Sequence, residues 1–290
     1  MRILTEVRGP SPLATTAGFV SLDAEKRVVL RDVHGGEVTR TLSAREPIRV
    51  AVSPDRRMLA VGTMAGEVAL YDVDSGAHVW TTVIGEREGW VTALAFNEVG
   101  DQLAVGTRNI AMVDVGSGRL LAHRELTHWR MGTAVTDVVC APGAARAVWA
   151  VVGTHLRTFA LPALDDMVDV DLDTASMLAA CDATRCFSLV VGGAAVLNAT
   201  NGALSGPLLA AGDDTGATRL AVEGDRCAVL LSGPEGLLLQ LGTFSPTLLE
   251  TARIVLPGAA ETANALGGVS FCPGAVLVAT TAGVVRVELP

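Results

Sequence analysis

The sequence predicts an all-β protein built from repeated four-stranded units, and three observations support this fold class. Two segments are variants of one pattern, VSPDRRMLAVGT at 52–63 and FNEVGDQLAVGT at 96–107, and a shorter VGT recurs at 152–154. The small residue that ends this pattern returns every 39 to 48 residues, at Gly62, Gly106, Gly153, Gly192, Ser232 and Thr280. A step of 40 residues back from Gly62 reaches Leu22, which makes seven units of about 41 residues, the length of a propeller blade. We therefore predict a seven-bladed β-propeller that occupies residues 1–290 as a single domain.

Each unit has the period-two alternation that half-buried strands require. In the second unit the predicted strands are 48–52, 58–62, 68–73 and 78–83. The turns between them contain Pro, Asp, Ser and Gly, which suit positive φ or side-chain bonding to the backbone. The third unit repeats this plan, with WVTALAF, QLAVG, IAMVDV and LLAHREL as its strands. Units four to six are less regular but keep the same order of strands and turns.

The last unit, residues 269–290, ends after its third predicted strand. An open sheet would leave an exposed edge, which proteins normally cover or close. Residues 1–7, MRILTEV, precede the first unit and have the pattern of an outer strand. We predict that this N-terminal strand supplies the fourth strand of the last blade.

Composition excludes some classes of function. Half of the residues are hydrophobic, yet no uncharged apolar run approaches the roughly 18–20 residues of a membrane span. Glu6, Arg8 and Pro10 stand where a signal peptide needs its apolar region, so we expect a cytoplasmic protein. The net charge of −9 opposes binding to phosphate backbones. We expect neither nucleic acid nor membrane as a partner.

Residues with catalytic or metal-binding chemistry are sparse. There is no GxSxG nucleophile elbow, and no two of the five histidines have the i, i+4 spacing of a helical metal pair. The five cysteines form no CxxC pair, so we expect buried structural thiols. His78 and His123, at the ends of outer strands, are expected to face solvent. We predict no catalytic residue and no cofactor.

Two metal hypotheses stay open beside this prediction. His128 and His155 could together face the entrance of a central channel, but no third ligand is visible. The acidic segment 165–173 could hold calcium, but it lacks a glycine turn and a bidentate carboxylate at the required spacing. Its alternation instead favours an outer strand with one charged face, which protects a sheet edge from pairing.

The loops between one unit and the next carry the strongest candidates for a binding site. In a propeller these loops share one rim with the turns between second and third strands, where binding residues commonly lie. Trp, Arg and Met are enriched in interface hot spots. The candidate partner-binding residues are Arg45, Arg87, Trp90, Arg108, His128, Trp129, Arg130, Met131 and His155. Either tryptophan could instead cap the core between blades; this interpretation is favoured for Trp90, and an interface for Trp129.

Two units resemble a known family. GWVTALAFNEVGDQLAVGT and PIRVAVSPDRRMLAVGT are similar to the core of a WD-repeat unit, which implies a β-propeller that binds proteins. The Gly-His opening is missing, and the Trp-Asp ending is replaced by Arg31-Asp32, Tyr71-Asp72 and Val113-Asp114. The family's buried network of His, Ser, Trp and Asp is therefore not carried over. LYDVDSGAHVW at 70–80 also resembles a quinoprotein-type propeller unit, in which Asp, Gly and Trp lock adjacent blades.

Two functions remain open. The first is a non-catalytic platform, a scaffold or regulatory subunit that binds a separately encoded protein through the rim. The second is an enzyme or small-molecule sensor, lactonase-like or quinoprotein-like, that uses the central channel. Propellers serve both kinds of function, so the fold does not decide between them. The lack of clustered carboxylates and histidines favours the platform.

Overall fold

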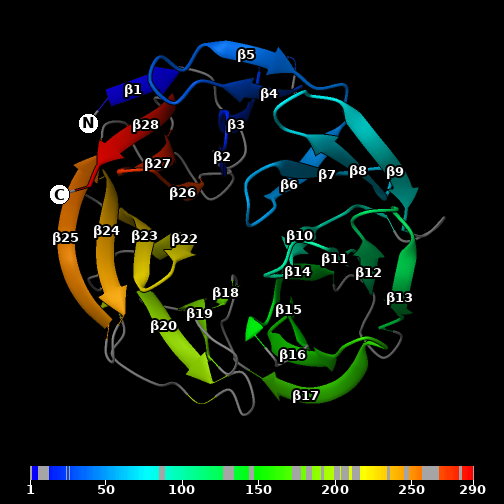
Figure 1. The fold of residues 1–290 in the computed structure, drawn as a ribbon. Coiled ribbons are helices and arrows are strands. Elements are labelled where there is room, and N and C mark those ends of the chain that lie inside the picture. The colour runs from blue at the N-terminus through cyan, green and yellow to red at the C-terminus, as the bar shows by residue number, and fades with distance from the viewer. Residues whose placement is uncertain are drawn as a thin grey trace. The chain divides into compact units, whose positions relative to one another are not determined.

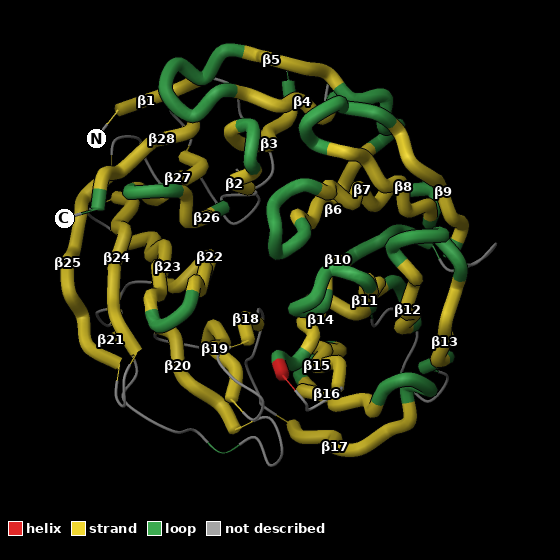
Figure 2. Tube along the Cα trace, in the orientation of Figure 1, coloured by secondary structure: helices red, strands yellow, loops and turns green. Residues whose placement is uncertain are grey.

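The fold was analysed in a computed structural model of the chain (Figure 1). The structure describes residues 2–5, 13–23, 25, 27–84, 89–126, 134–143, 147–171, 178–180, 185–190, 193–198, 203, 209–210, 216–233, 236–244, 248–256, 268–280 and 283–289. Within these residues the strands form seven antiparallel sheets of four strands each. Figure 2 shows that nearly all of this part of the chain is strand or turn. The all-β prediction and the count of seven four-stranded units are confirmed.

The chain divides into two compact units, which we describe separately. The first unit contains Met1–Ser43, Phe187–Val196 and Leu204–Pro290. Its sheets have the orders β2-β3-β4-β5, β22-β23-β24-β25 and β1-β28-β27-β26. The strands are β1 Arg2–Thr5, β2 Leu13–Thr15, β3 Gly18–Leu22, β4 Val28–Arg31, β5 Val38–Thr41, β22 Gly216–Glu223, β23 Arg226–Gly233, β24 Gly236–Phe244, β25 Leu248–Leu256, β26 Val269–Cys272, β27 Ala275–Thr280 and β28 Gly283–Glu288.

The second unit contains Ala44–Cys186 and Leu197–Ala203. Its sheets are β6-β7-β8-β9, β10-β11-β12-β13 and β14-β15-β16-β17. The strands are β6 Pro47–Val52, β7 Met58–Thr63, β8 Glu67–Asp72, β9 His78–Val83, β10 Ala93–Phe96, β11 Gln102–Gly106, β12 Ile110–Asp114, β13 Leu120–Arg124, β14 Val135–Cys140, β15 Ala147–Val152, β16 His155–Ala160 and β17 Asp165–Asp171. The remaining sheet has the order β18-β19-β20-β21, and its residues are divided between the two units. Its strands are β18 Leu178–Ala180, β19 Arg185–Val190, β20 Gly193–Asn198 and β21 Leu209–Ala210.

The turns between first and second strands are closed by side chains that the repeat pattern supplies. The Ser53 hydroxyl accepts the N–H of Met58 and donates to Asp55. In the next sheet the Asn97 side-chain oxygen accepts the N–H groups of Gly100 and Gln102. These bonds satisfy backbone donors that the ladder leaves open, so the SPD and NEVG segments set where each second strand begins.

The turns between third and fourth strands each depend on one aspartate. Asp72 accepts the backbone and hydroxyl protons of Ser75, and Asp114 does the same for Ser117. These bonds hold the pKa of Asp114 below its usual value, the Ser117 hydroxyl being the largest cause. Gly76 and Gly118 follow in the left-handed region, at φ 69° and 71°, where a glycine is favoured.

The last sheet is completed by the N-terminus, as predicted. β1 pairs antiparallel with β28, with Ile3 opposite Val285 and Thr5 opposite Val284. In Figure 1 the blue strand β1 lies beside the red strand β28. The first residues of the chain therefore cover a sheet edge that β28 would otherwise expose.

The acidic segment forms the outer strand β17, as predicted, with Val168 and Val170 half-buried between exposed aspartates. Its pairing with β16 shifts register between Thr158 and Phe159, and Met167 is the extra residue. The outer strands β5, β9, β13 and β25 each carry a comparable shift against their partners. A bulge twists an outer strand and disrupts its ladder, which makes edge pairing with another chain less favourable.

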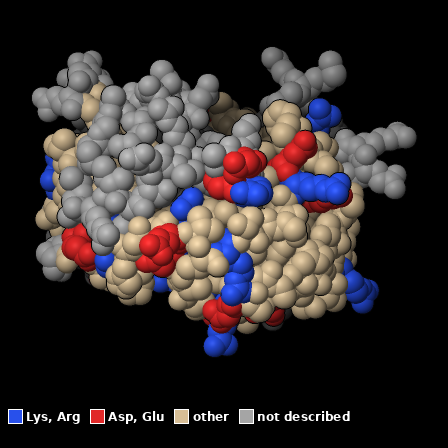
Figure 3. Space-filling view, turned by 90° about the horizontal axis from the view of Figure 1, so that it is seen from above, with Lys and Arg blue, Asp and Glu red and all other residues tan. Residues whose placement is uncertain are grey.

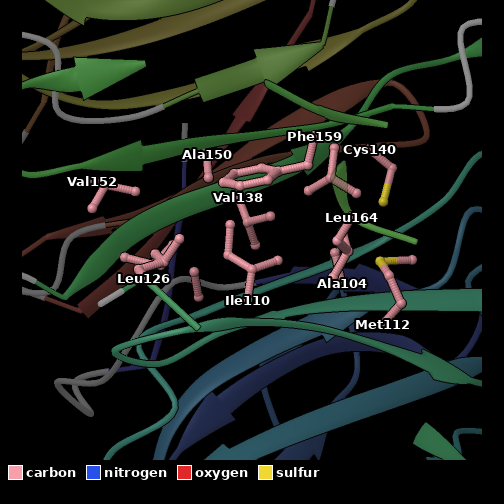
Figure 4. Packing of buried hydrophobic residues seen from close by; sticks show 13 residues of the cluster. Ala104, Ile110, Met112, Leu126, Val138, Cys140, Ala150, Val152, Phe159 and Leu164 are labelled. Carbon is pink, nitrogen blue, oxygen red and sulfur yellow. The ribbon is translucent and has the colours of Figure 1, made fainter. Parts of the chain in front are cut away.

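The core of the second unit lies between consecutive sheets (Figure 4). Phe159, Ile110 and Val138 come from three different strands of two sheets and are buried together. Four cysteines, Cys140, Cys186, Cys227 and Cys272, are buried thiols, as expected, while Cys181 lies outside the described residues. Burial raises the pKa of the Cys140 thiol to about 12, so this sulfur stays protonated and unreactive at neutral pH.

Deleting residues 1–7 tests the importance of the N-terminal strand. The deletion uncovers β28, and we expect the melting temperature to fall by roughly 4 °C or more, or the protein to aggregate. Circular dichroism melting and size-exclusion chromatography measure the two effects. Adding a synthetic peptide of residues 1–7 should restore stability, whereas an unchanged melting temperature in the deleted protein would contradict the role of β1.

Candidate interaction rim

The loops between consecutive sheets of the second unit lie beside the turns between second and third strands, as predicted. The N–H of Met64 donates to the carbonyl of Glu46, and the N–H of Val91 donates to that of Thr63. One sheet further along, the N–H of Val135 donates to the carbonyl of Thr107 at 2.9 Å. We call the described residues 44–46, 63–66, 89–91, 107–109 and 153–155 the rim. Backbone hydrogen bonds join the segments 44–46, 63–66 and 89–91 to one another.

The repeated glycine of the LAVGT pattern is needed because the next sheet occupies the space of its missing side chain. A Cβ on Gly62 would lie 2.4 Å from Cγ1 of Val91, and a Cβ on Gly106 would lie 2.7 Å from Cγ1 of Val135. Both valines are fully buried. Each valine also donates the backbone bond to the threonine that follows the glycine. The motif therefore joins consecutive sheets.

The threonine of the same pattern shapes the rim turn. The buried Thr63 hydroxyl accepts the N–H groups of Ala65 and Glu67, and the Thr107 hydroxyl accepts the N–H of Asn109. The Asn109 side chain then accepts the N–H of Leu126, where the next loop begins. Polar groups that the strands leave open are thus satisfied within the rim.

Trp90 is the most prominent described rim residue. Its side chain is 57% exposed, whereas its neighbour Val91 is fully buried against Gly62. Gly89, at φ 79°, turns the chain immediately before it. The interpretation of Trp90 as a core cap is therefore wrong, because anchoring Val91 inward directs the preceding side chain outward.

The other predicted rim residues have different placements. Arg45 and Arg108 are exposed, in the loop before β6 and in the turn before β12. His155 begins β16, is half-buried and bonds Asp169 through Nδ1 at 2.8 Å. The remaining candidates lie outside the described residues, namely Arg87, His128, Trp129, Arg130 and Met131.

The His155 contact belongs to a charged network that the sequence did not reveal. Arg157 donates to Asp166 at 2.5 Å and lies 3.6 Å from Asp169, between two carboxylates of β17. Arg124, on β13 of the neighbouring sheet, also binds Asp166. The 42-residue separation of Arg124 and Asp166 is one repeat length, which is the only signal in the sequence that could have indicated this pair. Exposed ion pairs stabilise little, so the network mainly orients the two outer strands.

A second junction lies on the outer side of the sheets. The Trp80 indole Nε1 donates to the Val115 carbonyl at 2.7 Å, and the Thr82 hydroxyl donates to the Gly118 carbonyl. A Cβ on Gly118 would lie 2.8 Å from the Trp80 ring. This contact matches the blade lock implied by the quinoprotein-type resemblance of residues 70–80, with the glycine supplied by the following sheet.

Metal-binding groups do not converge in the described part of the chain. No group of three His, Cys, Asp or Glu side chains there could hold an ion. His78 is exposed as expected, with Nε2 2.7 Å from the Thr81 hydroxyl, whereas His123 is half-buried and the solvent-facing expectation is wrong for it. In Figure 3 acidic and basic side chains stand in mixed groups on the face shown. None of the described segments forms a helix with the length and apolarity needed to cross a bilayer.

Comparisons with known proteins agree with this geometry. Residues 50–141 match the model of the anaphase-promoting complex subunit 4 WD40 domain. The structure titled U3-55K is 14% identical, covers 99% of this chain and 98% of that chain, and superposes with a TM-score of 0.75. The WD40 repeats of RRP9 are 14% identical to this chain. The match covers 96% of this chain and 89% of that chain, with a TM-score of 0.73. A chain of the mitotic checkpoint complex is 15% identical. The match covers 99% of this chain and 90% of that chain, with a TM-score of 0.74. A search of curated protein sequences finds no match.

The chain is a WD-repeat-like β-propeller. Its seven four-stranded sheets are the blades, and the last blade is completed by the N-terminal strand β1. The predictions of fold class and family resemblance are confirmed. At identities of 14–15% these likenesses establish the fold.

The departures from the WD pattern have local explanations. Arg31 stands where the family has tryptophan, is 7% exposed, and donates to the Ser21 hydroxyl and the Gly36 carbonyl. Desolvation lowers the pKa of its guanidinium, which these bonds keep satisfied. Tyr71 and Val113 occupy the corresponding places and are buried. The position is thus a core site in all three blades, filled by different side chains.

Replacing Gly62 by alanine tests the contact between consecutive blades. The new methyl group would overlap Val91, and we expect a loss of about 1–3 kcal/mol in the free energy of unfolding. Combining Gly62→Ala with Val91→Ala should cost less than the sum of the two single changes, because the closest overlapping atom, Cγ1 of Val91, is removed and only its Cβ, at 2.7 Å, still overlaps. Chemical denaturation measures these differences.

Gly116→Ala is the matched control, because its Cβ would meet only the Asp114 Oδ1 at 3.6 Å. We expect this change to stay within about 0.5 kcal/mol of the unchanged protein. Strict additivity of the Gly62 and Val91 changes would contradict a direct contact between the two residues.

Proposed function

We propose that this protein is a non-catalytic interaction platform, a scaffold or regulatory subunit that binds a separately encoded protein through its rim. The observation that carries the proposal is the exposed indole of Trp90 on a backbone fixed by its buried neighbour Val91. An aromatic side chain held rigidly in solvent loses little conformational entropy when a partner covers it. Arg45 and Arg108, both exposed on the same rim, add the other residue type enriched in hot spots.

The partner is proposed to be a protein. The net charge of −9 disfavours nucleic acid, since binding to phosphate backbones relies on clustered cations. We propose that the protein acts in the cytoplasm and not at a membrane. The similar structures include a chain of the mitotic checkpoint complex, a multiprotein assembly, which supports this class of role.

The alternative, an enzyme or sensor, requires convergent polar groups. Within the described residues several of these groups bind neighbouring strands or turns, as His155 binds Asp169 and Asp114 binds Ser117. The pKa of Asp114 is lowered by the Ser117 hydroxyl, whereas a general acid near neutral pH needs a raised pKa. These contacts support a structural use of the groups and favour the platform.

Trp90→Ala tests the proposal directly. We expect the binding free energy for the partner to weaken by about 2 kcal/mol, or roughly thirtyfold in Kd, as hot-spot truncations do. The melting temperature should stay unchanged because the indole is largely exposed. The partner is first recovered by affinity purification from the native cell with mass spectrometry, and Kd is then measured by titration.

Val99→Ala is the matched control, because Val99 is 80% exposed in the turn between β10 and β11, away from the rim. We expect this variant to bind like the unchanged protein. A folded Trp90→Ala protein with unchanged affinity, and an equally unaffected Trp129→Ala, Arg130→Ala protein, would eliminate both the rim and the predicted candidates beside it as the contact surface.

Chelation distinguishes the platform from a metal-dependent enzyme. We expect treatment with EDTA to leave both the melting temperature and partner binding unaltered, because the proposed contacts need no ion. Elemental analysis of the purified protein accompanies the measurement. Stoichiometric zinc or calcium, with a loss of stability after its removal, would favour the enzyme.

A further inference from the structure

The outer strand β9 has a sheet edge without charged residues, and its one bulge lies at the start of the strand. It is the last strand of the sheet β6-β7-β8-β9 and pairs only with β8 in that sheet. Its sequence, HVWTTV, contains no Asp, Glu, Lys or Arg. Sheet edges are usually protected from added strands by charges, prolines or cover, and β9 has neither the charges nor the proline.

The hydrogen-bond pattern shows which backbone groups of β9 face outward. The N–H of Ile84 donates to the carbonyl of Gly66, so Ile84 and Gly66 form a hydrogen-bonded pair of the antiparallel ladder. Pairs alternate along an antiparallel ladder, so Thr82 opposite Val68 and Trp80 opposite Leu70 also bond to β8. The N–H and C=O groups of Thr81 and Val83 therefore point away from β8.

The two faces of β9 have different roles. Trp80 and Thr82 bind Val115 and Gly118 of the next blade, which holds the strand in place. Val79, Thr81 and Val83 are exposed on the opposite face. The strand is therefore a rigid edge with outward backbone groups and a row of β-branched side chains, the features that accept an added strand.

Comparison with β17 in the same unit shows how different this edge is. Asp165, Asp166, Asp169 and Asp171 line β17, and carboxylates at a sheet edge oppose an added strand. β13 likewise ends in His123 and Arg124. Of these three strands β9 is the one without a charged residue, so its edge is the one best suited to an uncharged guest.

The exposed area argues for a short guest. Four apolar side chains here are each 44–52% exposed: Val79, Val83, Leu120 and Leu121. Leu120 and Leu121 come shortly after Gly118, whose carbonyl binds the Thr82 hydroxyl. The exposed surface of these four side chains together is roughly 200–300 Å². A standard stable interface buries roughly 800 Å² per partner, which is much more. A second copy of this chain would need more surface than the edge offers.

We infer that the edge of β9 is a strand-addition site for a short, extended, uncharged peptide segment of a partner protein, with β-branched or apolar residues at alternate positions. The guest strand pairs with the backbone of Thr81 and Val83 and covers the side chains of Val79 and Val83. This site is distinct from the rim and does not depend on the proposed rim partner.

The probe is the capped, uncharged peptide QTVTVTQ, compared with an analogue N-methylated at alternate amides, which has the same side chains and cannot pair. Amide hydrogen exchange is followed residue by residue. We expect the peptide to slow exchange at Thr81 and Val83 about tenfold or more, with little change at Thr82, whose N–H already bonds to β8. The N-methylated analogue should have no such effect.

Two variants make the test specific. Val83→Lys places a charge on the edge and should weaken peptide binding at least about tenfold by fluorescence anisotropy. Val255→Lys, the same change on the outer strand β25 at a residue 65% exposed, should leave binding unchanged. Thr81→Pro removes an outward N–H, so it should abolish binding while the fold is retained.

The opposing outcomes are equally clear. Equal protection by both peptides, or binding unaffected by Val83→Lys, would overturn the site. Concentration-dependent dimers in analytical ultracentrifugation that disappear in Val83→Lys would overturn the peptide as occupant in favour of a second copy. Trp90→Ala should not change peptide binding to β9. The rim proposal and the β9 proposal can therefore be contradicted independently of each other.

Discussion

Consecutive blades of the second unit depend on one contact, the valine of one blade packed against the glycine of the blade before it. Val91 over Gly62 and Val135 over Gly106 leave no room for a methyl group on either glycine. The N–H of each valine also donates to the carbonyl of the threonine that follows the glycine, Thr63 or Thr107, so the backbone holds the valine in the same place. Close packing of this kind tolerates little change in volume, because displaced atoms have no free space to enter.

The rim follows from this contact. In one blade Val91 is anchored inward and the residue before it, Trp90, is exposed to solvent. The outer junctions, Trp80 on Gly118 and Arg124 with Asp166, hold the far ends of the same blades. With both ends fixed, the loops present side chains on a rigid frame, which is the arrangement that a binding platform requires.

Sheet edges are managed in different ways around the chain. The edge of β28 is covered by the chain's own N-terminus, and β17 is protected by carboxylates that also bind Arg157 and Arg124. β9 has only a bulge near its start, where Val79 is the extra residue, and no charge. The same backbone geometry that accepts β1 on β28 is therefore available to another chain on β9.

The sequence by itself determined the blades and their closure, because period-two alternation, turn residues and a 41-residue repeat are local or periodic signals. It also indicated that β17 is an outer strand and that Cys140 is a buried thiol. Only the tertiary structure decided that Trp90 is exposed and that His155 binds Asp169 in a network reaching Arg124. Exposure and pairing depend on which side chains from other strands fill the surrounding space, and a one-dimensional pattern does not contain that information.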